Sequence, residues 1–159
     1  MLTGKNIVLR NLVFDDLDFL YNIENNEELW KYGSERKKIS KKNLVDYISN
    51  SNIDISIANQ FRFVIDLLNQ PIGFIDLFNY KIHQAEVGII IDQPFRRKGY
   101  AKEALNLISI YAFEVLKSDQ LLCKINIKNQ SSISLFSSCG FKLFTENKIC
   151  KTFILRNYL

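Results

Sequence analysis

One segment of the chain, residues 89–104, reads IIIDQPFRRKGYAKEA and organises the elements around it. Its three consecutive isoleucines are typical of a buried strand, and Pro94 ends that strand. A short basic turn follows, and a helical pattern begins directly after Gly99. The sequence therefore predicts a strand, a glycine turn and a helix in immediate succession.

This succession predicts a binding site for an anionic phosphate. The first N–H groups of a helix have no partner within the helix, and the helix dipole favours negative charge at that end. Gly99 has no Cβ, so the backbone can approach a ligand closely. Arg96, Arg97 and Lys98 add positive charge around the same point.

The composition indicates an ordinary globular protein. A chain of 159 residues with 47% hydrophobic and 24% charged residues fits a single domain over residues 1–159 and not a disordered chain. No apolar run approaches the roughly 20 residues that cross a bilayer, and the N-terminus lacks a secretory signal pattern. We therefore expect a cytoplasmic protein with no membrane partner.

Charged residues, cysteines and the single histidine exclude several kinds of site. A net charge of +4 suits an anionic ligand, but the basic cluster is short and has no interleaved aromatic residues, so we expect no nucleic acid partner. Cys123, Cys139 and Cys150 lack metal-ligand spacing, so we expect reduced thiols and no metal. His83 alone excludes a site with two imidazoles and is expected in a loop.

The remaining pattern predicts an α+β fold. Before the opening segment, helices are expected after Asp15 or Asp16 and from Ser40, and strands at residues 6–12, 61–67, 72–80 and 85–92, with a turn at residues 69–71. After it, we expect a helix at 101–115, a strand at 121–127, a short helix from Asn129 to Gly140, and strands at 141–144 and 151–158. A meander of strands followed by a crossover helix implies a mixed sheet.

Several segments resemble the GNAT N-acetyltransferase superfamily. Residues 96–101, RRKGYA, are similar to its pyrophosphate-binding signature, Arg/Gln-x-x-Gly-x-Gly/Ala, and lie between a strand and a helix as that signature requires. Residues 129–141, NQSSISLFSSCGF, resemble its Asn-x-x-(Ser/Ala)-Ile-x-Leu-Tyr-x-x-x-Gly-Phe segment, and residues 7–17 and 71–91 resemble its first strand and its central strands. The nearest resemblance is to bacterial spermidine/diamine and ribosomal-protein alanine N-acetyltransferases. It implies a central sheet of about seven strands with one splayed strand pair, and about four helices.

The resemblance implies transfer of an acetyl group from acetyl-CoA to a primary amine by direct attack in a ternary complex. The amine would belong to a polyamine-like small molecule or a protein N-terminus, and a homodimer is possible. The resemblance assigns the CoA diphosphate to the basic glycine turn, the pantetheine arm to the strand before it, and a further contact to the second motif. The residues are Arg96, Arg97, Lys98, Gly99, Tyr100 and Ala101, then Ile89, Ile90 and Ile91, and finally Asn129.

Glu86 is the candidate general base, because the attacking amine must be neutral and a free alkyl amine has a pKa of ~10.4. The alternative is that Glu86 is a solvated strand-end carboxylate or an ion-pair partner. For a polyamine, four glutamates can attract the cationic acceptor, and the alternative is a solvated acidic helix end; they are Glu24, Glu27, Glu28 and Glu35. We expect the acceptor pocket in residues 27–38, with Trp30 and Tyr32.

Phe136 departs from the family pattern, because many members have tyrosine there to protonate the leaving thiolate. Three consequences are open: the thiolate leaves without an acid, Ser137 or Tyr111 acts instead, or the protein is a slow or non-catalytic binder. The alternative function is therefore an acyl-CoA-binding or interaction protein on a GNAT scaffold.

Overall fold

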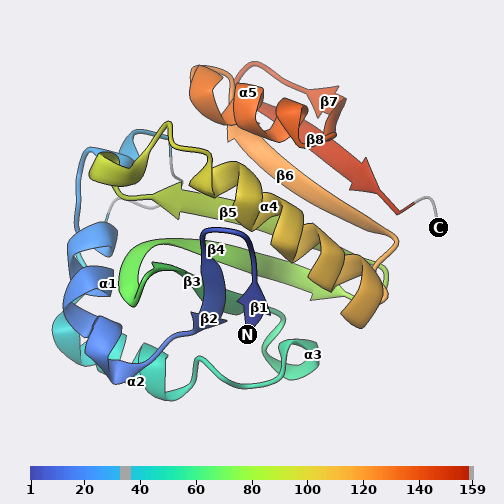
Figure 1. The fold of residues 1–159 in the computed structure, drawn as a ribbon. Coiled ribbons are helices and arrows are strands. Elements are labelled where there is room, and N and C mark those ends of the chain that lie inside the picture. The colour runs from blue at the N-terminus through green and yellow to red at the C-terminus, as the bar shows by residue number, and fades with distance from the viewer. Residues whose placement is uncertain (33–36, 158–159) are drawn as a thin grey trace.

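A computed structural model describes residues 1–32 and 37–157, which form a mixed eight-stranded sheet with helices on both faces (Figure 1). The strands lie in the order β1-β2-β3-β4-β5-β6-β8-β7. They span β1 Leu2–Thr3, β2 Val8–Asn11, β3 Phe61–Leu67, β4 Gln70–Lys81, β5 Gln84–Ile91, β6 Gln120–Asn126, β7 Lys142–Glu146 and β8 Cys150–Arg156. The α-helices span α1 Leu17–Glu24, α2 Lys41–Ser49, α3 Ile55–Ala58, α4 Tyr100–Ile110 and α5 Gln130–Ser138. The predicted α+β class and the approximate element counts are confirmed.

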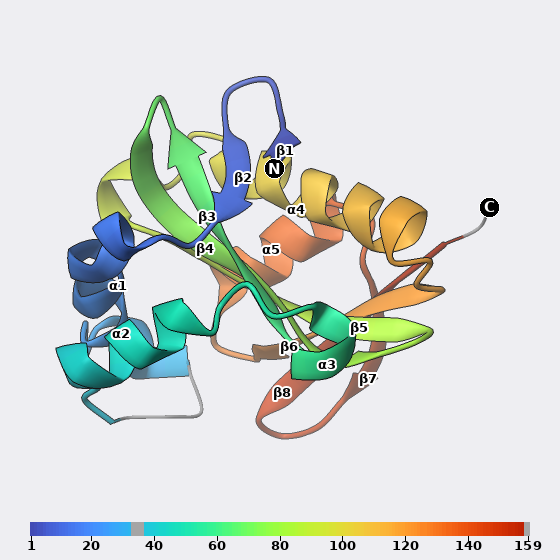
Figure 2. The same ribbon diagram turned by 90° about the horizontal axis from the view of Figure 1, so that it is seen from below.

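The two faces of the sheet have separate cores. Helices α4 and α5 cover one face, and α1 and α2 cover the other (Figures 1 and 2). Alternate residues of one strand enter opposite cores, as on β3, where Phe63 and Ile65 face α4 and Val64 faces α1 and α2. The predicted amphipathic stripe of α4 supplies Ala104 and Leu105 to the first core.

The sheet contains one parallel strand pair, and that pair is open along most of its length. β5 and β6 are joined by α4, and they pair only from Gln84↔Gln120 to Glu86↔Leu122. β5 then continues to Ile91 beside β4 alone, while β6 pairs with β8. The two strands therefore splay beyond Glu86, as the family resemblance predicted.

Most predicted helix ends are confirmed. The side chains of Ser40 and Asn129 accept hydrogen bonds from the N–H groups of Asn43 and Ser132. Gly140, just after α5, has φ +88°, the left-handed conformation of a glycine C-cap. The sequence also predicts that Asp15 or Asp16 caps the first helix, but Asp16, at the N-cap of α1, makes no side-chain bond to that helix, and its Oδ2 accepts from the N–H of Val13 at 3.0 Å.

The buried carboxylate of Asp16 instead binds Arg10. Both oxygens of Asp16 accept from the guanidinium at 2.8 Å, and Arg10 Nε also donates to Asp66 at 2.7 Å. Hydrogen bonding to Asp16 raises the pKa of Arg10, although burial opposes this. The charge opposite Asp16 therefore explains its burial better than a helix cap does.

The first hairpin turn lies earlier than predicted. Leu68 and Asn69 have φ values of 53° and 66° and form the turn, whereas Gln70 and Pro71 already belong to β4. The register shifts between Ile65 and Asp66, opposite Pro71. A proline cannot donate to a ladder and is tolerated at such an irregularity, so it did not end the strand here.

Three short features were not predicted: strand β1, helix α3 and a π-helical turn at Tyr111–Val115 that closes the long helix. Strands and helices of two to five residues are too short to show a period. Within residues 1–32 and 37–157, we find no helix with the length and apolar character that a membrane span requires.

Candidate active site

The turn between β5 and α4, residues 92–99, forms an open backbone site, which we call the phosphate turn. Asp92 Oδ1 accepts from the N–H of Gln93 at 2.8 Å and fixes its start. Gly99 ends it with φ +88° and is the N-cap of α4. A Cβ built on Gly99 would meet no atom within 4 Å, so the space in front of the helix N-terminus is open. This geometry suits an anionic group that approaches the backbone.

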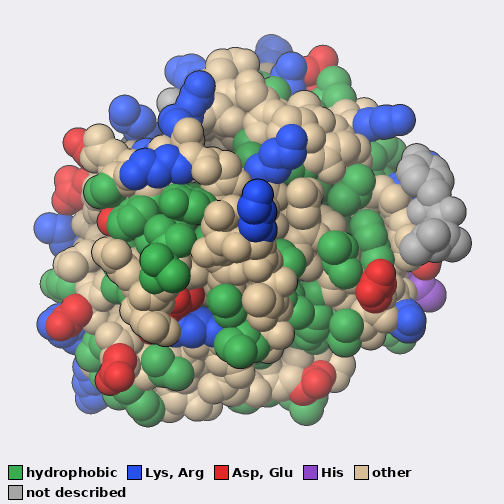
Figure 3. Space-filling model, in the orientation of Figure 1, with side chains coloured by type: hydrophobic (Ala, Val, Ile, Leu, Met, Phe, Trp, Pro, Cys, Tyr) green, Lys and Arg blue, Asp and Glu red, His purple; other side chains and the backbone are tan. Residues whose placement is uncertain are grey.

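The three basic residues of the phosphate turn lie differently. Arg96 Nε donates to the carbonyl of Ile91 at 2.8 Å, so Arg96 braces the turn. Arg97 has φ +63°, and Lys98 lies over the ring of Phe95 at 5.6 Å. All three are exposed. Lys and Arg side chains gather over the region where α4 begins and α5 lies (Figure 3), which makes this side attractive to anions.

Ile89, Ile90 and Ile91 continue from the phosphate turn into the open strand pair. Their main chains pair with β4 on one side, and their other side faces the splay. Asn129 lies across the splay at the start of α5, where its Oδ1 accepts from the N–H of Ser132 at 3.2 Å. Peptide-like amides can add to such an unpaired strand edge.

Glu86 belongs to the last residue pair that joins β5 and β6, Glu86↔Leu122. We call this point, where the two strands begin to separate, the apex of the splay. Glu86 Oε1 accepts from Asn79 Nδ2 at 3.0 Å and from Lys124 Nζ at 3.2 Å. Its side chain is 13% exposed. Glu86 pairs with Phe78 across the hairpin and lies on the α1/α2 face, since Gly88 and Ile90 alternate with it along β5. Both sequence-based interpretations of this residue have support, because it lies at the apex and also makes an ion pair.

A second group of charges lies on the same face. Arg62 Nε and Nη2 donate to the two oxygens of Asp76 at 2.6 and 2.9 Å, and Nη1 donates to Glu24 at 2.5 Å. The guanidinium also lies over the rings of Tyr47 and Phe74. Burial alone would lower the pKa of Arg62, but the two carboxylates raise it well above its usual value, so it stays charged. One positive and two negative groups leave a net negative charge here.

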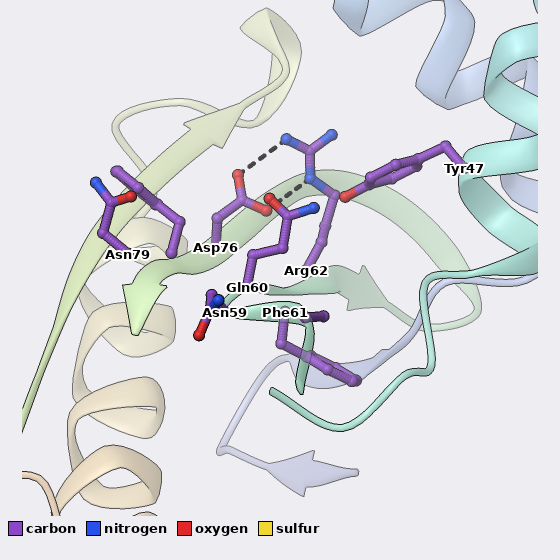
Figure 4. A pocket seen from close by; sticks show the side chains of 9 residues that line it. Tyr47, Asn59, Gln60, Phe61, Arg62, Asp76 and Asn79 are labelled. Atoms are coloured by element: carbon purple, nitrogen blue, oxygen red, sulfur yellow. Dashed lines mark hydrogen bonds and ion pairs between the residues drawn. The ribbon is translucent and has the colours of Figure 1, made fainter. Parts of the chain in front are cut away.

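These charges border a cavity of about 410 Å³, which we call the Arg62 cavity (Figure 4). Its lining combines mainly aromatic, amide and charged residues from α2, β3, β4, the end of α3 and the segment between α3 and β3. The lining residues are Tyr47, Ala58, Asn59, Gln60, Phe61, Arg62, Asp76, Phe78 and Asn79. Asn79 both lines the cavity and donates to Glu86, so the cavity and the apex of the splay adjoin.

Phe136 lies on α5 and is 3% exposed. Its ring meets Phe141 edge-on, with the centroids 5.0 Å apart. Of the two substitute acids, Ser137 follows Phe136 and is exposed, whereas Tyr111 lies in the π-helical turn at the opposite end of α4 from the phosphate turn. Tyr111 packs edge-on against Phe63, and burial raises its pKa. The geometry therefore disfavours Tyr111 as a proton donor.

The comparison with known families identifies the fold. A sequence profile described as acetyltransferase (GNAT) domain matches residues 6–142. The chain belongs to this family. It is an N-acetyltransferase that acts on amines with acetyl-CoA as the acetyl donor, as the motifs predicted.

Individual proteins support the same assignment. The chain is 29% identical to a spermidine N(1)-acetyltransferase of Vibrio cholerae over 140 residues, which are 87% of this chain and 80% of that protein. A V. cholerae spermidine N-acetyltransferase in complex with CoA and spermine matches the structure with a TM-score of 0.83 at 24% identity, over 96% of both chains. Campylobacter jejuni PseH in complex with acetyl coenzyme A matches with a TM-score of 0.74 at 22% identity, over 94% and 98% of the chains. These structural matches confirm the GNAT fold.

The acidic residues proposed for the acceptor lie apart from one another. Glu24 binds Arg62 beside the cavity, Glu27 pairs with Lys38 at 3.6 Å on the surface, and Glu28 is exposed. Glu35 lies outside the described residues. Trp30 Nε1 donates to the carbonyl of Glu24 at 2.9 Å and does not line the Arg62 cavity.

Sequence reasoning missed the side chains that build the cavity. Arg62 and Asp76 lie within strands that otherwise read as apolar, and this is the one signal that identifies them. Opposite charges at inward positions of neighbouring strands indicate a buried pair. Asn79 and Lys124 become neighbours of Glu86 only through the registers of β4, β5 and β6. Among the described residues, no group of three or more His, Cys, Asp or Glu side chains could hold a metal ion.

Proposed function

We propose that the chain acetylates a primary amine of a small polyamine-like molecule, which binds in the Arg62 cavity. The observation that carries this proposal is the position of Asn79, which connects the cavity to Glu86 at the apex of the splay. An amine that extends from the cavity toward Asn79 reaches the carboxylate beside the open strand pair. The V. cholerae relative is named for spermidine, and a solved spermidine N-acetyltransferase from V. cholerae is in complex with CoA and spermine.

The lining of the cavity suits an alkyl chain with more than one ammonium group. Phe61, Phe78 and Tyr47 offer aromatic surfaces to methylene groups and cations. Asn59 and Gln60 offer amide oxygens. The network of Arg62, Asp76 and Glu24 is net negative, which favours a cationic ligand.

The open strand pair and the phosphate turn fit acetyl-CoA. We assign the diphosphate to the N–H groups of Arg97, Gly99, Tyr100 and Ala101, with positive charge from Arg96 and Lys98. Ile89, Ile90 and Ile91 would present main-chain groups to the pantetheine amides, with Asn129 on the opposite side. The support is the open space at Gly99 and the unpaired side of β5 beyond Glu86. When bound, acetyl-CoA supplies an acetyl thioester.

Glu86 would act as the general base that accepts the proton of the incoming ammonium. Asn79 and Lys124 hold its carboxylate in place through hydrogen bonds. Phe136 offers no proton to the leaving group, but a thiol has a pKa of ~8.5 and can leave as the thiolate. We therefore expect turnover without a side-chain acid at position 136. Residues 1–159 would act as one domain, and the homodimer remains a prediction.

The test is an acetylation screen that measures thiol release from acetyl-CoA. The panel contains spermidine, spermine, putrescine, an amino sugar and a peptide with a free N-terminus. We expect the polyamines to react faster than the other amines. A faster peptide or sugar, or no thiol release with any amine of the panel, would overturn the proposed polyamine acceptor.

A matched pair of variants locates the acceptor. Tyr47→Ala removes an aromatic wall of the Arg62 cavity and should raise the KM for spermidine by about tenfold, which corresponds to ~1.4 kcal/mol. Tyr21→Ala removes an aromatic residue of the neighbouring helix α1 that does not line the cavity, and its KM should stay unchanged. Equal KM values for the two variants would contradict binding in this cavity.

A further inference from the structure

The ammonium of Lys124 binds the carboxylate of Glu86, which the ammonium of an acceptor must also reach. Its Nζ lies 3.2 Å from Glu86 Oε1. The lysine side chain is 60% exposed, whereas the carboxylate is 13% exposed. The protein therefore presents its own primary amine to the group that we assign as the general base.

The position of Lys124 along β6 places this amine at the opening of the splay. The last parallel pair joins Glu86 to Leu122, and Lys124 follows two residues later, where β6 no longer pairs with β5. Side chains alternate along a strand, so Lys124 lies on the face of Leu122. Cys123 between them faces the opposite core under α4.

The surroundings of Lys124 favour reaction at its nitrogen. Asn79 holds Glu86 from the other side, so the carboxylate stays directed toward the amine. On the neighbouring strand β8, Thr152 pairs with Lys124 and is uncharged. The lysine side chain is largely exposed while its partner Glu86 is also held by Asn79, which suits a flexible lysine that reaches a nearby carbonyl.

From this geometry we propose that Lys124 is an internal acetyl acceptor, so that the enzyme acetylates its own β6. Glu86 takes one proton from the Nζ ammonium, and the neutral nitrogen forms a bond with the acetyl carbon. The C–S bond of the thioester breaks, and the sulfur leaves with the electron pair. The second proton of the nitrogen passes to the sulfur, and Glu86 releases its proton to solvent. The products are Nε-acetyl-Lys124, CoA thiol and one proton.

This inference rests on the proposed role of Glu86, and it adds a consequence for external amines. A polyamine ammonium that reaches Glu86 competes with the ammonium of Lys124, because the carboxylate can take a proton from only one of them at a time. Spermidine should therefore slow the acetylation of Lys124 in proportion to its occupancy of the site.

The experiment incubates the full chain with acetyl-CoA in the absence of an amine and follows each lysine by peptide mass spectrometry. Lys41, the first residue of α2, is the internal control, because it is 56% exposed and pairs at 2.6 Å with Asp18 of α1 and not with Glu86. We expect Lys124 to be acetylated at least about tenfold faster than Lys41, at a rate that does not change when the protein is diluted. Equal rates at the two lysines, or a rate at Lys124 that rises with protein concentration, would overturn the proposal.

Two variants test the chemistry. Glu86→Gln should slow acetylation at Lys124 by about tenfold or more and leave Lys41 unchanged. Lys124→Arg should remove the modification while the affinity for CoA stays the same. If Glu86→Gln slowed both lysines equally, the effect would not come from a base beside Lys124, and the proposal would fail.

Thiol release with spermidine and calorimetric titration with CoA, on the same protein, separate the two proposals. Turnover of spermidine with no preference for Lys124 overturns the internal acceptor alone. Preferential acetylation of Lys124 without turnover of any external amine supports the internal acceptor and overturns the proposed polyamine substrate. Loss of CoA binding overturns both.

Discussion

The phosphate turn follows the end of β5, whereas the Arg62 cavity lies beside β3 and β4, and the two sites are built in different ways. The phosphate turn is one continuous stretch, and it presents backbone groups around Gly99. The Arg62 cavity is assembled from side chains of β3, β4 and α2 and the segment before β3. A backbone site depends on local conformation, whereas a side-chain site depends on strand register and on compensated charges. The two sites should therefore respond to different substitutions.

Glu86 belongs to the acceptor side of this comparison, and its substitution should have the largest effect. Glu86→Gln keeps the shape of the side chain but removes the base, so kcat for spermidine should fall by roughly 10²–10⁴-fold. The dissociation constant of CoA should not change, because the phosphate turn is untouched. Glu114→Gln, an exposed carboxylate in the π-helical turn, is the control and should leave kcat unchanged. Steady-state thiol release measures kcat, and calorimetry measures the dissociation constant. A parallel loss of CoA affinity would contradict the independence of the donor and acceptor sites.

Arg62 tests whether the cavity depends on compensated charge. Arg62→Met leaves Asp76 and Glu24 facing each other without their cation, and the free energy of unfolding should fall by about 3 kcal/mol. Lys38→Met removes the cation of the exposed pair with Glu27 and should change it by less than about 1 kcal/mol. Urea denaturation measures both variants. CoA should still stabilise Arg62→Met at low urea. Similar losses of unfolding free energy in the two variants would show that the charge network at Arg62 contributes no more stability than an exposed ion pair.

Gly99 and Gly140 give a matched test of the backbone site, because both have φ +88°. Alanine is strained in this conformation, so each Gly→Ala variant should lose about 1 kcal/mol of folding stability. Only at Gly99 does the added methyl group enter the open space where the diphosphate is proposed to bind. Gly99→Ala should therefore weaken CoA binding by about tenfold, while Gly140→Ala should not change it. Equal CoA affinities of the two variants in calorimetric titrations would contradict binding of the diphosphate at the phosphate turn.

The same contrast explains what the sequence predicts and what it does not. Residues 89–104 predicted a strand, turn and helix correctly, because backbone conformation follows from local residues. The turn at 69–71 was misplaced because Pro71 tolerates a strand position opposite a register shift. The role of Asp16 was wrong because its partner Arg10 lies on strand β2, outside the helix. The Arg62 cavity was not predicted, since its residues meet only when β3 and β4 pair and α2 packs on them. A sequence motif therefore predicts the acetyl-CoA site at the phosphate turn more directly than it predicts the acceptor site at the Arg62 cavity.

Glu103 gives the smallest expected effect, and it lies in the first turn of α4, behind the phosphate turn. Its carboxylate accepts from the N–H groups of Asn6 and Ile7 at 2.7 and 3.2 Å and from the Asn6 side chain at 2.8 Å. Burial alone would raise the pKa of Glu103, but these hydrogen bonds lower it below its usual value. A lowered pKa in the folded state means that the ionised carboxylate stabilises the fold above the unfolded pKa of ~4.3. This stabilisation is lost as the pH falls through the lower folded pKa.

Glu103→Gln should accordingly reduce the free energy of unfolding by less than about 1 kcal/mol at pH 7, because the hydrogen bonds between Glu103 and Asn6 are exposed to solvent. The difference from the unsubstituted chain should shrink as the pH falls through ~4.3 and disappear below the folded pKa. Urea denaturation at several pH values measures it, with Glu114→Gln as a control that should show no such trend. A difference that persists at the lowest pH would mean that Glu103 stabilises the N-terminal segment through shape and not charge. Packing alone would then hold the helix behind the phosphate turn, whereas compensated charges hold the residues of the Arg62 cavity.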